Sequence, residues 1–278
     1  MSVAQVIVAM TGIIGDRTEA RDLLALMQGR PRHWPAISAS ELLTRHESDA
    51  AERAAKKRAS GAPLEYAAGK AAFRHLTLNV DERVLIPRPE TEVLVDIVLD
   101  LTRDTSGGIA VDVGTGSGAI ALALASEGRF ESVIATDISL DALHVARANA
   151  VQLGIPVDFR HGSLLTPVTE RNVRAIVSNP PYIAHDEADA LPVAVRDWEP
   201  SVALFSGAGG MATTSELIRA SAAVLASGGI LALEVDVRRA AVVVEHLASH
   251  GAYESVRVLL DLTGRERFVA ARLRETSA

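Results

Sequence analysis

The sequence contains no cysteine, so it can form neither a disulfide framework nor a thiolate metal site. It has no excess of positive charge either, because its formal net charge is −7 at pH 7. That balance argues against a protein that neutralises long stretches of phosphate backbone, and we expect no stable nucleic-acid binding. The apolar opening over 2–15 is too short to span a bilayer and lacks the basic start and cleavage site of a secretory signal. We therefore expect a first helix there, no membrane partner and a cytoplasmic protein.

Side-chain sets for nucleophilic or metal-assisted catalysis are also missing. No Ser/His/Asp or Cys/His arrangement is evident. His246 and His250 lie one helical turn apart, a spacing that can bind metal, but no third ligand or carboxylate base accompanies them. We expect a surface helix at this position and no metal site.

The chain has enough apolar residues for more than one hydrophobic core. Of its 278 residues, 48% are apolar and 23% are charged, which is ordinary for a soluble globular protein. We expect two domains and a connection: a helical domain over 1–70, a β-hairpin linker over 71–90 and a larger domain over 91–278.

Residues 1–70 carry helical patterns. Apolar residues at three-to-four-residue spacing predict an amphipathic helix around 20–27. The S-x-x-E spacing of Ser38-Ala39-Ser40-Glu41 is that of a capping box and predicts a helix start. A third helix over 49–60 should stop at Gly61-Ala62-Pro63, because proline cannot continue a helix. It carries a basic run that we interpret as a solvated face, with docking to an acidic protein or ribosomal RNA as the alternative: Arg53, Lys56, Lys57 and Arg58.

The pattern changes after residue 70. Apolar and polar residues alternate over 76–80, Asp81-Glu82 supply turn chemistry, and an apolar run follows at 84–86. This succession predicts a β-hairpin. The proline-containing stretch 87–92 then predicts a stiff corner that leads into an apolar helix over 93–101.

Strands and helices alternate through the rest of the chain. We expect strands over 109–113, 132–137, 156–160 and 175–179, with helices over 119–126 and 140–150 between them. Such alternation predicts βαβ units and a mostly parallel sheet covered by helices on both faces, which is the α/β class. The late strands at 229–235, 254–262 and 267–273 should end the sheet, the last two as an antiparallel hairpin.

A glycine loop, Gly114-Thr115-Gly116-Ser117-Gly118, follows one of these strands and opens a helix. Glycines let the backbone approach a ligand closely, and the helix N-terminus favours electron-rich groups. Asp137 ends the next strand, where an acidic side chain accepts hydrogen bonds from both hydroxyls of a cofactor ribose. The two features indicate an adenosine-bearing cofactor, with a simple helix-capping role for Asp137 as the alternative.

A second motif, Asn179-Pro180-Pro181-Tyr182, follows the strand at 175–179. Neither proline has a backbone N–H, so the turn offers only acceptors: the carbonyls of Asn179 and Pro180 and the Asn179 side-chain oxygen. Residues before proline are held extended, which fixes where those carbonyls point. A rigid cluster of acceptors is suited to an NH₂ group.

Such a cluster suits methyl transfer to an amide or conjugated amine. The nitrogen lone pair of these groups is delocalised, so they are poor nucleophiles. Holding both N–H bonds on fixed acceptors would aim the lone pair and favour positive charge on nitrogen, and Tyr182 would stack on the planar group and exclude water. No dedicated general base is required, because the nitrogen becomes acidic only as the methyl group arrives.

The loop Asp112-Val113-Gly114-Thr115-Gly116 resembles the S-adenosylmethionine loop of class I methyltransferases more than the G-x-G-x-x-G loop of nicotinamide enzymes. The whole chain resembles the HemK/PrmC family of protein-(glutamine-N5) methyltransferases, which modify peptide chain release factors. The stretches that carry this resemblance are EARDLLA, LIPRPETEVLVD, VDVGTGSGAIALALA, TDISLDALHVARANA, SNPPYI, VRDWEPSVALFSG and DLTGRERFV.

The resemblance implies a Rossmann-like catalytic domain at 91–278 that methylates the glutamine of a release factor's Gly-Gly-Gln loop, which the helical domain helps to grip. It implies that S-adenosylmethionine is held by Asp112, Val113, Gly114, Thr115, Gly116, Asp137, Leu164 and Asn179. It implies that the glutamine side chain is held by Asn179, Pro180, Pro181 and Tyr182. The chain departs from the family at Ser163, where an acidic residue is common, and at the glycine-rich stretch 207–211.

Three alternatives remain at this point. The acceptor could be a glutamine of a ribosomal protein, which the chemistry does not separate from a release factor. It could be an exocyclic adenine nitrogen, although that would require base flipping and an extended basic surface. The chain could also be a cofactor-binding module without activity, since a fold alone does not establish function. The intact motif at 179–182 argues against the last.

Overall fold

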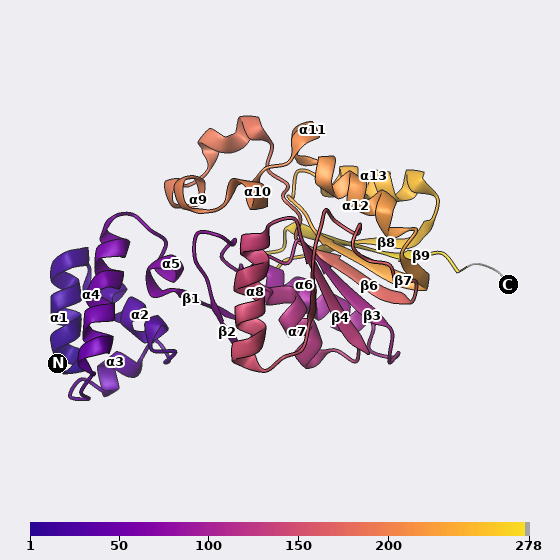
Figure 1. Cartoon of the computed structure of the whole chain (residues 1–278). Helices are drawn as coiled ribbons and strands as arrows, with labels where there is room; N and C mark the ends of the chain where they lie inside the picture. The colour runs from indigo at the N-terminus through magenta and orange to yellow at the C-terminus, as the bar shows by residue number, and fades with distance from the viewer. Residues whose placement is uncertain (276–278) are drawn as a thin grey trace.

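The computed structural model describes residues 1–275, and within them a helical region is followed by a small hairpin and a large mixed sheet (Figure 1). The helical region has its own core, built on Val6, Met10, Leu23 and Leu24. Its helices are α1 (Val3–Ile14), α2 (Arg17–Met27), α3 (Trp34–Ile37), α4 (Arg45–Ala59) and α5 (Leu64–Ala68). The predicted helices at the N-terminus and around 20–27 are confirmed as α1 and α2.

The helix start predicted at Ser38–Glu41 is wrong. Those residues form a turn, and the Glu41 carboxylate accepts a hydrogen bond from Trp34 Nε1 instead of capping a helix. The working capping box lies a few residues later, where Thr44 and Glu47 bond each other's backbone N–H groups. One helix, α4, therefore replaces the two that were predicted, and it ends before Gly61 as expected.

Most of the basic run on α4 is paired within the chain. Lys56 contacts Glu52, Lys57 contacts Glu82, and Arg58 reaches both Glu19 and the carbonyl of Ala62. These contacts fit the interpretation of the run as a solvated face.

The structure contains a hairpin, but not the predicted one: the strand expected at 76–80 is present, whereas its partner precedes it and is not the run at 84–86. Strand β1 (Lys70–Phe73) pairs with β2 (Leu76–Asn79), so the turn lies at residues 74–75. Residues 84–86 form no strand. Their side chains Val84 and Ile86 are buried instead against Tyr66 and against Ala142 of the large sheet's helix layer, and burial accounts for an apolar run that looked like a strand.

The large sheet has the order β5-β4-β3-β6-β7-β9-β8; its first five strands in this order pair in parallel, and β9 is antiparallel to both β7 and β8. This confirms the predicted class I methyltransferase-like α/β fold and its C-terminal antiparallel hairpin. The strands are β3 (Ile109–Val113), β4 (Ser132–Asp137), β5 (Asp158–His161), β6 (Val173–Ser178), β7 (Leu225–Glu234), β8 (Tyr253–Leu260) and β9 (Glu266–Leu273). The main helices are α6 (Pro89–Leu101), α7 (Ala119–Glu127), α8 (Leu140–Leu153), α12 (Ala212–Ser221) and α13 (Ala240–His250).

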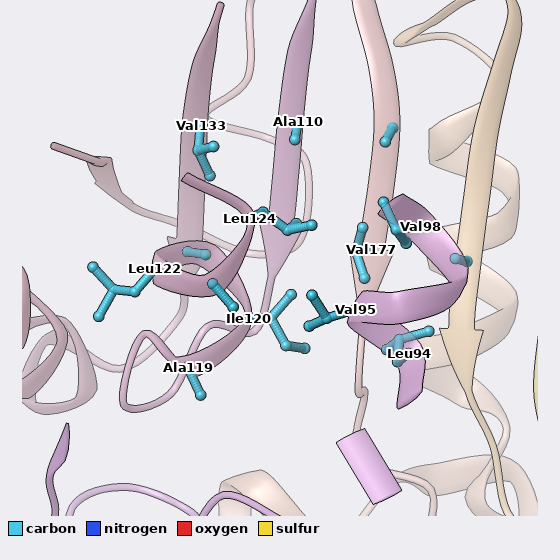
Figure 2. Packing of buried hydrophobic residues seen from close by; sticks show 14 of the residues in the cluster. Leu94, Val95, Val98, Ala110, Ala119, Ile120, Leu122, Leu124, Val133 and Val177 are labelled. Atoms are coloured by element: carbon cyan, nitrogen blue, oxygen red, sulfur yellow. The ribbon is translucent and has the colours of Figure 1, made fainter. Parts of the chain in front are cut away.

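Two apolar layers cover the sheet, as period-two strands require. In β3, Ala110 belongs to the core on one face while Val111 belongs to the core on the other. Figure 2 shows the first layer, in which Val95 of α6 and Ile120 of α7 lie over the strands near Val177. The second layer is formed by α12 and α13. The sheet is therefore packed between two layers of helices.

Between β6 and β7 the chain forms short helices above the strand ends: η1 (His185–Ala190), α9 (Val193–Trp198), α10 (Ser201–Leu204) and α11 (Gly207–Gly210) (Figure 1). Within residues 1–275, no helix has the length and apolar character needed to cross a membrane.

Candidate functional site

The predicted glycine loop and the Asn179 motif lie side by side, because β3 and β6 are neighbours. Val113 is in register with Ser178 at the carboxyl ends of the two strands, and Ser178 Oγ donates to the Val113 carbonyl at 2.7 Å. The chain leaves β3 toward β4 on one side and returns as β6 on the other. This is the topological switch point, where open α/β sheets bind ligands.

The glycine loop has the backbone that its sequence requires. Gly114, Gly116 and Gly118 all have positive φ, between 56° and 87°. A Cβ on Gly118 would lie 3.2 Å from Leu122 Cδ1 and 3.3 Å from Ala146 Cβ, so glycine also allows α7 and α8 to pack closely. At the start of the loop, Gly114 N and Thr115 N both donate hydrogen bonds to the carbonyl of Thr136.

Asp112 lies beneath the loop and is fully buried. Its Oδ2 accepts hydrogen bonds from Thr115 Oγ1 (2.6 Å) and Ala121 N (3.0 Å), and burial raises the pKa of this carboxyl to about 7. Asp112 Oδ1 has no partner among residues 1–275. Neither Asp112 nor Thr115 lines the cavity described below, so within this arrangement they shape the loop from underneath.

Asp137 faces the cavity at the end of β4. Its Oδ2 accepts from Gly116 N (2.9 Å) and its Oδ1 from Ser139 N (2.8 Å). Burial raises the pKa of Asp137, while these backbone donors act in the opposite direction. Each carboxylate oxygen keeps a lone pair for a further donor, so the two oxygens together can accept hydrogen bonds from the two hydroxyls of a ribose.

Ser163 and Leu164 also line the cavity. Leu164 has a positive φ of 49°, and its carbonyl accepts a hydrogen bond from Thr136 Oγ1 at 2.8 Å. The left-handed backbone places an apolar side chain at the cavity edge, which fits a flat aromatic base.

Of the second motif, Asn179, Pro180 and Pro181 line the cavity and Tyr182 does not. Tyr182 is largely enclosed, and burial raises its pKa to about 12. Its backbone lies against Gly210, where a Cβ would come within 2.3 Å of the Tyr182 carbonyl oxygen. Tyr182 is thus absent from the cavity lining, and stacking of its ring on a substrate stays a prediction.

The cavity that these residues share has a volume of about 310 Å³. Motif reasoning missed its opposite wall, formed by Arg83, Val84, Leu85, Pro200, Val202, Ala203, Phe205, Ala212, Thr213 and Glu216. This wall is tied down by backbone bonds from Ile183 N to Leu204 O and from Ser206 N to Ile183 O. Arg88 also donates to the buried Glu199 at 2.5 Å. The sequence predicted a hairpin strand at 84–86 and indicated 200–205 only through the family resemblance, and it singled out neither Arg83 nor the residues at 212–216.

His246 and His250 have ordinary structural contacts. His246 Nδ1 lies 3.0 Å from Ser215 Oγ, and the His250 ring lies against Tyr253. Among the described residues, no group of three or more His, Cys, Asp or Glu side chains is arranged to hold a metal ion.

Comparisons with known proteins agree with this geometry. A family model described as methyltransferase small domain matches residues 90–196. A release factor glutamine methyltransferase from Gloeobacter violaceus is 38% identical over 256 residues, covering 91% of this chain and 90% of the relative. One from Moorella thermoacetica is 39% identical over 278 residues, covering 96% and 95%. A crystal structure of a methyltransferase from Pyrococcus furiosus shares the fold, with a TM-score of 0.56 at 20% identity, over 74% of this chain and 92% of that one.

Proposed function

The chain belongs to the family of release factor glutamine methyltransferases, and on that premise we propose that it methylates the side-chain amide nitrogen (N5) of the glutamine in the Gly-Gly-Gln loop of peptide chain release factors. Such a modification would modulate translation termination. The observation that supports this most directly is that Asn179, Pro180 and Asp137 line one cavity, so acceptors for an amide lie beside acceptors for a ribose.

We assign one end of the cavity to S-adenosylmethionine, which supplies an electrophilic methyl group on a sulfonium sulfur when bound. Asp137 would accept hydrogen bonds from the ribose hydroxyls, and Leu164 would cover the adenine. Val113, Gly114 and Gly116 line the part nearest the strand ends and would allow the cofactor's amino acid portion to approach the backbone. Asp112 and Thr115 would hold the loop in this shape from below.

The other end would hold the glutamine amide. Among residues 1–275, nothing donates to Asn179 Oδ1, so this oxygen and the carbonyl of Pro180 are free to accept the two N–H bonds. Fixing both N–H bonds directs the lone pair along the line of attack and stabilises the positive charge that builds on nitrogen. Transfer would form the N–CH₃ bond as the S–CH₃ bond of the cofactor breaks, with the bonding pair staying on sulfur, and the proton released by nitrogen would pass to solvent water.

The proposal extends to the rest of the chain. We assign residues 1–70 to gripping the release factor, residues 71–90 to the linker and residues 91–278 to catalysis. The linker also lines the cavity through Arg83, Val84 and Leu85. We place the reaction in the cytoplasm, because a chain without cysteine is suited to a reducing compartment.

Transfer of labelled methyl from S-adenosylmethionine to a purified release factor tests the proposal. The substrates to compare are the wild-type release factor, its loop variant with glutamine replaced by alanine, ribosomal proteins and DNA. Label that appears on the release factor and is lost in its variant supports the proposal. Label only on a ribosomal protein or DNA overturns the substrate, and cofactor binding without any transfer indicates a binding module.

A further inference from the structure

Two buried polar side chains lie behind Asn179, on elements far from it in sequence. Thr91 is in the first turn of α6 and is 5% exposed, while Glu234 ends β7 and is fully buried. Asn179 Nδ2 donates to Thr91 Oγ1 at 3.2 Å, and Thr91 Oγ1 donates to Glu234 Oε2 at 2.7 Å. The three side chains form one continuous chain of hydrogen bonds that starts at the cavity wall.

Glu234 decides which atoms donate and which accept along this series of hydrogen bonds. An ionised carboxylate can only accept, and a hydroxyl has a single hydrogen, so the hydrogen of Thr91 is committed to Glu234. Thr91 Oγ1 can then only accept from Asn179, which must present its NH₂ group. Because the two atoms of an amide point in different directions from one carbon, Asn179 Oδ1 is left to face the cavity.

Burial of the Glu234 carboxylate is energetically unfavourable. Desolvation raises the pKa of its carboxyl to about 7, and its Oε1 has no hydrogen-bond partner within residues 1–275. The nearest cation is Arg267 of β9, whose Nε lies 3.9 Å away. A buried charge with one oxygen unpaired contributes little to stability, and an apolar or amide side chain would occupy this place at lower cost. This favours a role in orienting its neighbours.

We propose that Thr91 and Glu234 are positioning residues that hold the Asn179 amide with its oxygen toward the substrate nitrogen. This inference rests on the proposed function, because it assigns the orientation to the acceptor end of the same cavity. If Asn179 turned over, its NH₂ group would face the N–H bonds of the glutamine, and the pocket would repel the group that it is to bind.

The main test is Thr91→Val, with Thr91→Ser as the matched control. Valine keeps the shape of threonine but leaves both Asn179 Nδ2 and Glu234 without a partner. We expect kcat to fall by about 10- to 100-fold, with cofactor affinity unchanged by calorimetry, because the Asn179 amide is no longer held with its oxygen toward the substrate nitrogen. Serine keeps the hydroxyl and should restore most of kcat. A valine variant that turns over like wild type, or a serine variant as slow as valine, overturns the inference.

The pH profile gives a second test that does not depend on Thr91→Val folding. Protonated Glu234 would donate to Thr91, whose hydrogen would then point to Asn179 and favour the inverted amide. We expect kcat of the wild type to fall below about pH 7, and Glu234→Gln to lack this acidic limb. The charged or titratable groups acting on Glu234 are Arg88, Glu90, Arg267 and Tyr182.

Asp112 also has a pKa near 7, so Asp112→Asn is the control for the pH profile and should keep the acidic limb. A limb that survives in Glu234→Gln overturns the inference. The proposed function and the positioning role fail in different experiments. Wild-type enzyme that labels no release factor defeats the proposed function, whereas an active wild type with an unaffected Thr91→Val defeats only the positioning role.

Discussion

The cofactor end and the substrate end of the cavity are held by different kinds of contact. At the cofactor end, Asp137 accepts the backbone N–H groups of Gly116 and Ser139, and Asp112 accepts the backbone N–H of Ala121 in α7 and the Thr115 hydroxyl. At the substrate end, Asn179 is held by the side chains of Thr91 and Glu234, which come from the first turn of α6 and from β7. The cofactor end therefore depends mainly on β3, β4 and the backbone of the loops that follow them. The substrate end requires three distant parts of the chain to be in place.

Asn179→Ala should produce the largest difference between the two ends. It removes the acceptor Oδ1 and leaves Thr91 without its donor, so we expect kcat to fall by about 100- to 1000-fold. Cofactor affinity should stay within about twofold of wild type, because Asp137 and the glycine loop are untouched. Steady-state kinetics and calorimetry measure the two effects. A variant with normal turnover would show that the amide clamp is not the basis of catalysis.

Asp137→Ala should affect the opposite end. It removes both carboxylate oxygens assigned to the ribose, and we expect the Kd for S-adenosylmethionine to rise by about 10- to 100-fold. Because this binding is lost equally before and during the reaction, kcat at saturating cofactor should change little. Ser139→Ala is a useful control, because it removes the side-chain cap of α8 but keeps the Ser139 N–H bond to Asp137. Equal losses in the two variants would indicate that Asp137 acts only on the helix start.

Of the three substitutions, Asp112→Asn should produce the smallest effect, and the quantity that it changes is the free energy of unfolding. The pKa of Asp112 rises to about 7 in the folded chain, whereas an unfolded aspartate titrates near 4. Between these values the folded state binds the additional proton, so this group's contribution to stability falls as pH rises from about 4 to 7. The uncharged variant lacks that loss.

We therefore expect the free energy of unfolding of Asp112→Asn, measured relative to wild type in urea, to rise by about 1–2 kcal/mol between pH 6 and pH 8. A difference that is flat with pH would mean that Asp112 is not buried as a perturbed acid. In that case the contrast between the cofactor end and the substrate end of the cavity would no longer include a buried acid beneath the glycine loop.

The same contrast explains what could be predicted from the sequence. Local motifs predicted the bounds of β3 and β4 and the place of the glycine loop, because these follow from residues adjacent in the chain. The assignment of these residues to a cofactor stays a prediction. Thr91 was noticed only inside a proline-rich corner, and Glu234 only as part of a late apolar strand. Their contact joins residues 143 positions apart, and no spacing rule reports such a pair.

The errors in the helical region have a related cause. Both Ser38–Glu41 and Thr44–Glu47 match the S/T-x-x-E pattern of a capping box. Only tertiary structure selects between them, because Glu41 accepts a hydrogen bond from the Trp34 indole whereas Glu47 takes part in the cap at Thr44. At the hairpin, the apolar run at 84–86 matches a strand, but its side chains are buried between the helical region and the large sheet.

Val84 belongs to two structures at once, since it packs in the cluster with Tyr66 and also lines the cavity. The Tyr66 hydroxyl donates to the Val84 carbonyl at 2.5 Å, which ties the last helix of the N-terminal region to that wall. The two regions are thus not interchangeable modules. A fragment that begins at α6 would keep the sheet and both motifs but would lose the part of the cavity wall formed by residues 83–85. Engineering a new target preference by swapping the N-terminal helices would therefore alter the chamber as well as the docking surface.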